Sequence, residues 1–375
     1  MFDSTILQLR IGPAPAPMPA PLAVMEALQD IEVTHGRGRN GFRITLAIGK
    51  SSPLMLALLP AGFFDPISTR VVISIAHRGI PLVLIDGIVT QQALKPGNEA
   101  GSSTLTLTGE DLSLLMDLVE VRIPWPAMPD AARVATILAK YATLGVVPRI
   151  VPPPVIIVES PTAHHYTQES TDRAYLTALA AQSGYVFYID PGPLPGQSVG
   201  YFGPDHRLPA LQPALNVNMD ADSNVESLSF TLDGTAKQLT MIRILDEATG
   251  KVTVTVPVPP VNPLHPPLGA RPTPPARTVF TEDTARLGSS EAAKRAYGIM
   301  RQSKDSITVS GSLNVASYGS VLRAGRMVGV RGAGLAFDGA YYVETVTHNI
   351  KPGEYKQSFT LARDGLGTLS PAVPA

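Results

Sequence analysis

One stretch of the chain has the spacing of a serine nucleophile. Gly196–Gly200 match G-x-S-x-G around Ser198, a pattern that needs a helix directly after the serine to present its hydroxyl at a sharp turn. The residues that follow, up to Pro204, are too rich in Gly and Pro for a stable helix. Asp190 and His206 lie near in sequence, but a catalytic triad is a spatial arrangement that this spacing does not specify. We therefore expect no serine hydrolase site.

A second stretch, Gly36–Gly41, matches the dinucleotide-binding pattern G-x-G-x-x-G. That function requires a helix after the glycines, so that the helix N-terminus meets the pyrophosphate. Here Phe42–Ile48 follow, and their strict alternation of apolar and polar side chains predicts a strand. The stretch is therefore interpreted as a hairpin loop.

Metal and acid–base chemistry find no support in the spacing. The chain has no Cys, which excludes disulfides, thiolate metal sites and a thiol nucleophile. The seven His are scattered, and the adjacent pair His164-His165 has diverging rings on either a helix or a strand. The neighbouring acids are better explained by helix first turns or turns than by a glycosidase pair: Glu110-Asp111, Asp220 and Asp222, and Glu282-Asp283. We expect no catalytic, cofactor-binding or metal-binding residues.

Charge and composition narrow the function classes further. The chain of 375 residues has 30 Lys plus Arg against 31 Asp plus Glu, a net charge of −1, which disfavours a nucleic-acid binder held by bulk electrostatics. Charged residues make up 16%, against about 25% in typical soluble domains, which suggests surfaces covered by other subunits. The 36 Pro are concentrated in runs, which indicates stiff connectors between folded parts. The longest apolar stretch has eleven residues, Leu54–Phe64, against ~20 for a membrane span, and the N-terminus lacks the pattern of a signal peptide.

The elements that would carry these residues are mostly strands in the first 120 residues. Phe42, Ile44, Leu46 and Ile48 share one face of a predicted strand, and Thr104–Thr108 again alternate. Asp86-Gly87 is interpreted as a turn. Short strands at this spacing predict an antiparallel barrel or sandwich.

The middle of the chain predicts two helices and a short hairpin. The first helix opens at Pro129-Asp130 and ends before Gly145. The second has Thr171 as its N-cap and ends at Gly184.

After residue 220 strands return, interrupted by a Pro-rich loop over 257–277 that cannot pair centrally in a sheet. A helix is predicted from Thr281 to about Ser303, and four more strands follow. The sequence thus predicts three domains: a first β domain over 1–125, an α/β insertion over 126–220, and a second β domain over 221–375.

Three segments together resemble one family. The first is Leu84–Thr90 with Ser103–Leu112, similar to the family's "F.G.VT … LTV.G.D". The second runs from Asp130 through Gln168–Asp172 to Gly184–Asp190, similar to "Q..TDWEFL.RLA...GY.FYVD". The third joins Leu322–Val328, Phe337–Val343 and Phe359–Gly367, similar to "L.AG..V.L.G.G..FDG.Y.V … F.L.RNGLG". In this order, from about 25 to 367, they resemble the phage late-control protein D family, the central baseplate hubs of contractile tails, also seen as the N-terminal part of VgrG spikes.

The resemblance implies a structural role rather than an enzyme. Its fold is mainly β with an α/β insertion: two barrel-like, tail-tube-like β domains and a small helix-containing subdomain. The family's hub is a homotrimer whose six β domains form a ring that adapts the six-fold tail tube to the three-fold spike. Expected partners are a separate trimeric spike protein, a tail-tube or tube-initiator protein and other baseplate proteins, with DNA or a tape-measure protein passing through the lumen. The particle would be assembled in the producing cell's cytoplasm. A tail-associated carbohydrate-binding or glycan-degrading β protein remains the alternative.

Ten residues of these segments are expected to be structural positions of the family's pattern rather than chemical groups. Phe337 is expected to anchor a turn at Asp338-Gly339, and Tyr341 begins a strand that does not alternate, which suggests a sheet covered on both faces. The complete set is Asp86, Gly87, Asp172, Gly184, Phe337, Asp338, Gly339, Tyr341, Arg363 and Gly365.

Overall fold

The computed structural model describes most of the chain, and every structural statement below concerns this part. The described ranges are 5–36, 40–98, 102–153, 166–205, 211–246, 251–258, 267–280, 295–296, 298–300 and 305–369. Among them no helix is long and apolar enough to cross a membrane. Strands dominate and helices are few and short, so the predicted mainly β class with a helix-containing insertion is confirmed.

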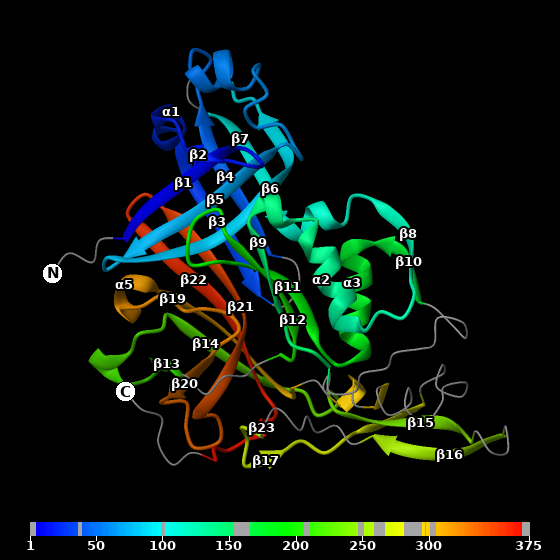
Figure 1. Ribbon diagram of the computed structural model, residues 1–375. Helices are drawn as coiled ribbons and strands as arrows, with labels where there is room; N and C mark the ends of the chain where they lie inside the picture. Colours follow the sequence, from blue (N-terminus) through cyan, green and yellow to red (C-terminus); the bar gives the residue numbers. More distant parts are fainter. Residues whose placement is uncertain are drawn as a thin grey trace.

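A single large sheet carries both ends of the chain (Figure 1). Within the described residues it has 13 strands, and the main path runs β14-β19-β22-β21-β3-β4-β7-β6-β5-β1-β2. Its N-terminal strands are β1 (Thr5–Pro13), β2 (Met18–Pro19), β3 (Leu28–Gly36), β4 (Gly41–Ile48), β5 (Thr69–His77), β6 (Ile80–Lys95) and β7 (Ser103–Asp111). Its C-terminal strands are β13 (Leu211–Asn216), β14 (Ser227–Leu232), β19 (Ile307–Asn314), β20 (Met327–Arg331), β21 (Gly339–Lys351) and β22 (Glu354–Arg363).

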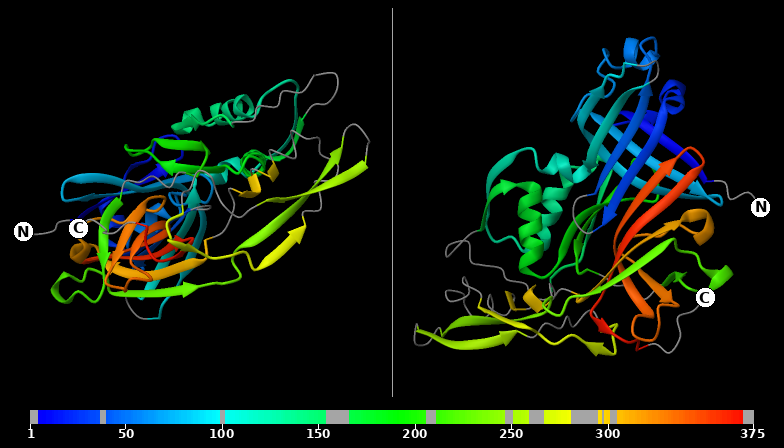
Figure 2. Two further views of the ribbon diagram at one scale, coloured as in Figure 1. Left: turned by 90° about the horizontal axis from the view of Figure 1, so that it is seen from below. Right: turned by 180° about the vertical axis from the view of Figure 1, so that it is seen from behind.

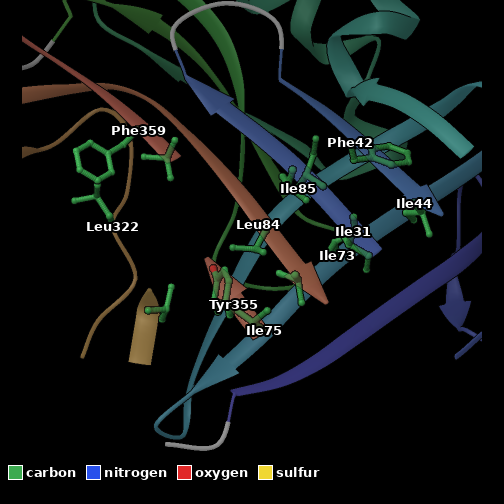
Figure 3. Packing of buried hydrophobic residues seen from close by; sticks show 14 of the residues in the cluster. Ile31, Phe42, Ile44, Ile73, Ile75, Leu84, Ile85, Leu322, Tyr355 and Phe359 are labelled. Atoms are coloured by element: carbon green, nitrogen blue, oxygen red, sulfur yellow. The ribbon is translucent and has the colours of Figure 1, made fainter. Parts of the chain in front are cut away.

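The two halves of this sheet meet at the antiparallel pair β3–β21, in which Ile31 lies opposite Ile350. One hydrophobic core follows the sheet through both halves (Figure 3), from Phe42 and Ile73 in the N-terminal strands to Tyr355 and Phe359 in the C-terminal ones. The β domains expected at the two ends of the chain are therefore packed into one continuous structure.

Alternation predicted the strands of the N-terminal half well. In β4, Phe42, Ile44, Leu46 and Ile48 are all buried while the intervening side chains are not, as the period of two requires. Because β3 and β4 pair antiparallel, the glycine-rich stretch between them joins a hairpin, which confirms the hairpin interpretation; 37–39 lie outside the described residues.

The turn predicted at Asp86-Gly87 is wrong, because both residues lie inside the 16-residue strand β6. Gly87 is needed for a different reason: a Cβ there would lie 2.2 Å from the carbonyl oxygen of Glu110 on the neighbouring strand β7. The ring of Phe42 covers this glycine. The sequence signal was a close approach of two backbones, which looks the same as a turn signal in a single sequence.

The irregular burial along β21 also has a local cause. The pairing of β21 with β22 shifts register between Val343 and Thr345, which is a β-bulge. Tyr341 and Val343 are buried before the shift, and Val346 and His348 after it, so the bulge at Glu344 moves the buried set by one residue.

The insertion packs beside the large sheet (Figures 1 and 2). It contains α2 (Asp130–Ala139) and α3 (Asp172–Gln182), the pair β8 (Glu120–Trp125) with β10 (Tyr166–Thr171), and a three-stranded sheet of β11 (Val186–Pro191), β12 (Ser198–Gly203) and β9 (Val146–Ile150). A second core around Val134, Leu176 and Phe202 holds these elements together.

Both predicted helices of the insertion are confirmed. Thr171 caps α3 by accepting from the backbone N–H of Ala174 at 3.2 Å. Gly184 follows its end with φ +64°, and the N–H groups of Gly184 and Tyr185 donate to the carbonyls of Ala181 and Ala180, a Schellman arrangement.

The remaining elements are small or lie at edges. A three-stranded sheet of β16 (Lys251–Val258), β15 (Gln238–Asp246) and β18 (Arg277–Phe280) extends away from the body, seen most clearly in Figure 2. The pair β17 (Arg271–Pro272) with β23 (Gly365–Leu366) places part of the Pro-rich segment at an edge. Helical turns are α1 (Leu22–Glu26), α5 (Val315–Tyr318), a π-helical turn at Leu54–Leu58, and 3-10 turns at Leu112–Met116, Ala142–Leu144 and Asp220–Asp222. The helix predicted from Thr281 falls largely outside the described residues, although 295–296 and 298–300 are helical.

Candidate functional site

Six of the ten motif residues come together around the buried guanidinium of Arg363. Its Nε donates to the carbonyl of Gly365 at 2.8 Å, Nη1 to that of Asp338 at 2.9 Å, and Nη2 to that of Ala336 at 2.8 Å. Its Cζ lies 4.4 Å from the ring centroid of Tyr341. Burial lowers the pKa of Arg363, but these partners hold the charged form without a carboxylate.

The loop before β21 is fixed by the same cluster. The Tyr341 hydroxyl donates to the carbonyl of Phe337 at 2.6 Å, and a carboxylate oxygen of Asp338 accepts from the N–H of Ala333 at 2.8 Å. Burial raises the pKa of Tyr341 to about 12, so its hydroxyl stays a donor at neutral pH. Gly339 has φ +132°, a conformation that favours glycine. The ring of Phe337 is half-buried against Phe230, so it anchors the turn less deeply than expected.

A second buried centre joins the large sheet to the insertion. Arg70 of β5 forms a bidentate ion pair with Asp86 of β6, at 2.6 Å from Nε and 2.7 Å from Nη2, and both side chains are almost fully buried. Arg70 also donates to the carbonyls of Ala14 and Gly196 at 3.0 and 3.2 Å.

The serine with nucleophile-like spacing belongs to this second centre. The Ser198 hydroxyl is buried and donates to Asp86 at 3.4 Å. A strand, β12, follows Ser198, so the expectation that no helix follows it is confirmed. In the expected triad, Asp190 instead pairs with His35, and His206 lies outside the described residues. The arrangement therefore ties the insertion to the sheet instead of activating the serine.

The third centre lies between the two helices of the insertion. The carboxylate of Asp172, at the start of α3, accepts from Lys140 at 3.0 Å, from the Tyr141 hydroxyl at 2.9 Å and from the Gln168 amide at 2.7 Å. Gly184 ends the same helix. In the described part of the chain, no group of three or more His, Cys, Asp or Glu could hold a metal ion.

A small polar pocket lies where the N-terminal strands, the insertion and the C-terminal strands meet. It has a volume of about 80 Å³. His35 of β3 and Asp190 of β11 face each other in it at 2.8 Å. The rest of its wall comes from the start of β6, the loop before β20 and β21: Leu82, Val83, Leu84, Pro191, Arg323, Ala324, Arg326 and His348. Each of the three parts of the chain thus contributes a side chain to it.

Sequence reasoning found the motif residues but missed this pocket and Arg70. Arg70 and Asp86 are 16 residues apart on neighbouring strands, and His35 and Asp190 are 155 apart. Neither pair has a local pattern. Only the excess of charged side chains inside otherwise apolar strands, as at Arg70 in Thr69–His77, signalled a buried ion pair.

The arrangement of these elements is shared with solved structures of tail proteins. No protein-family model and no curated protein sequence matches the chain. The tail protein of Neisseria meningitidis MC58 superposes with a TM-score of 0.61 at 16% identity, over 97% of this chain and 98% of that one. The 43 kDa tail protein of prophage MuSo2 from Shewanella oneidensis superposes with a TM-score of 0.62 at 15% identity, over 97% and 100%.

The chain has the fold of phage tail proteins. A Francisella structure of a PdpA-VgrG complex extends the likeness: the TM-score is 0.58 at 8% identity, and 99% of this chain covers 60% of that one. The common unit is therefore the whole of this chain and a part of the longer secretion-system protein.

Proposed function

We propose that this protein is the structural central hub of a contractile phage tail or a related injection particle. Three copies would form a ring that adapts the six-fold tail tube to a separate three-fold spike, assembled in the cytoplasm of the producing cell. The observation that carries the proposal is the correspondence with tail proteins over nearly the full length of both chains, with no large part left over for another task.

The division into three domains, with boundaries after 125 and 220, is part of this proposal. Two β halves in each copy supply six β units in a trimer, and the shared β3–β21 pair would hold the two halves of one copy at a fixed angle. The buried centres at Arg70, Asp172 and Arg363 support such a role, because each one fixes one element against another.

Exposed apolar side chains offer surface for partner chains. Leu22 is 72% exposed, Leu56 66% and Leu335 90%. Burial of such side chains is the main stabilising contribution to stable subunit contacts, and the low share of charged residues favours the same use.

The carbohydrate alternative requires an aromatic-lined groove with two facing carboxylates. The junction pocket has a single carboxylate, Asp190, and no Phe, Tyr or Trp in its wall, so it does not favour that function. We infer a non-enzymatic role.

Purification of intact particles tests the proposal. We expect this chain to co-purify with the tube and spike chains in a fixed ratio. Particles that assemble completely in a strain lacking this chain would contradict it.

A further inference from the structure

The junction pocket holds more positive charge than its own residues neutralise. Arg323 is half-buried in the loop before β20, and Arg326 is exposed at the same loop. Each raises the electrostatic potential at the other, and both burial and the nearby Arg326 lower the pKa of Arg323. In the described part of the chain, neither guanidinium forms a hydrogen bond or an ion pair.

The one carboxylate in the pocket is already engaged. Asp190 pairs with Nε2 of His35 at 2.8 Å, and it lies near enough to Arg323 to act on its pKa without an ion pair within 4 Å. The two arginines therefore face a cavity whose own acid is committed elsewhere. Guanidinium groups that converge in this way are the usual means by which proteins bind carboxylate or phosphate groups.

A third donor is prepared by the core beneath. The amide of Gln357 is oriented by two bonds to the backbone of Leu322, accepting from its N–H and donating to its carbonyl, each at 2.9 Å. The amide nitrogen also contacts Nδ1 of His348 at 3.2 Å, and since an amide nitrogen only donates, Nδ1 must accept. The proton of the neutral His348 ring therefore lies on Nε2, where it is free to be donated.

We propose that this pocket binds one small oxyanion, held by Arg323 and Arg326 with a hydrogen bond from His348. A volume of about 80 Å³ suits a single phosphate or carboxylate group, whereas pockets for drug-sized ligands are about 300–1,000 Å³. The bound group would cross-link the N-terminal strands, the insertion and the C-terminal strands, because all three line the pocket. The inference does not depend on the proposed tail role.

The oxyanion has two possible sources, a free inorganic anion or the side-chain carboxylate of a partner chain, and two probes distinguish them. Inorganic phosphate represents the first, and N-acetyl-aspartate α-amide the second. Each is titrated into the full-length protein while thermal unfolding is followed, with sodium chloride at matched ionic strength as the reference. We expect at least one probe to raise the unfolding temperature by about 2 °C or more beyond chloride, with saturation.

The decisive variant is the double substitution R323Q/R326Q. The gain from phosphate or from the aspartate derivative should disappear in it, while its unfolding temperature in chloride should equal or exceed that of the natural protein, because two like charges are removed. A purely structural role of the two arginines would instead lower it. The control R43Q/R122Q removes the same charge from exposed positions and should keep the full gain.

If the double variant does not fold, the single variants R323Q and R326Q are measured in its place, and each should weaken the gain. Phosphate alone raising the unfolding temperature would identify a free anion, and the aspartate derivative alone a partner's carboxylate. No gain beyond chloride with either probe, or an equal gain in R323Q/R326Q, would overturn the proposal.

Discussion

The guanidinium of Arg363 stacks on the ring of Tyr341, with Cζ 4.4 Å from the ring centroid, while its N–H groups bond three backbone carbonyls of the loop that leads to Tyr341. The pair therefore fixes the path of the chain into β21, the strand that joins the two halves of the sheet. Stability of the whole sheet should depend on this contact.

Arg363→Met should lower the free energy of unfolding by about 3–5 kcal/mol. The methionine fills part of the space but leaves buried carbonyl oxygens without donors, each a substantial cost. Urea unfolding measures it. The exposed Arg122→Met serves as the control and should change stability by less than about 0.5 kcal/mol. Equal stability of both variants would show that the Arg363 cluster does not hold the loop.

Gly339→Val should cost about 1–3 kcal/mol. The backbone at Gly339 has φ +132°, and an added Cβ would lie 2.9 Å from the Thr368 hydroxyl and 3.0 Å from Nη1 of Arg363. Gly49→Val is the matched control, because no atom lies within 4 Å of its Cβ position and its φ is not in the left-handed region. A melting temperature for Gly339→Val equal to that of the control would contradict the assignment of this motif as structural.

Asp86→Ala should destabilise the protein by about 3–5 kcal/mol, because Arg70 would keep its charge in a buried site without its partner. Ser198→Ala removes only a long hydrogen bond to the same carboxylate and should cost about 1 kcal/mol or less. Chemical denaturation compares the two. Ser198→Ala should also leave particle assembly intact; loss of a hydrolytic activity in that variant, with its fold preserved, would overturn the non-enzymatic role.

Acid should weaken the protein through His348. Burial, with smaller contributions from His35 and Arg323, lowers the pKa of His348 from 6.5 to about 3, so the folded protein favours the neutral ring. The resulting stability is fully present above pH 6.5 and is lost as the pH falls from 6.5 toward 3, on the order of 4 kcal/mol at most. His348→Gln should flatten the pH dependence of unfolding in this window. An unchanged slope between pH 6.5 and 4 would show that another group is responsible.

Local patterns predicted what is decided locally. The alternation of Phe42–Ile48, the cap at Thr171 and the left-handed Gly184 were all readable, because each depends on residues a few positions away. The mainly β class and the inserted helices followed from these patterns.

Contacts between distant segments could not be predicted in the same way. The pairing of β3 with β21, where the Thr34 and Thr347 hydroxyls lie 3.2 Å apart, joins positions 313 residues apart in sequence. The bulge at Glu344 and the close approach at Gly87 also arise from neighbouring strands, so the first looked like a two-sided sheet and the second like a turn. The pocket with Arg323 and Arg326 exists only once three parts of the chain have packed together.

The molar mass of the assembly tests the account most directly. The chain of 39.7 kDa is co-expressed with the spike chain of its particle and measured by light scattering after size-exclusion chromatography. The account predicts one complex that contains three copies of this chain and three of the spike, even if the free chain is monomeric before it meets the spike. A stable monomer that elutes apart from the spike would contradict the proposed trimeric hub.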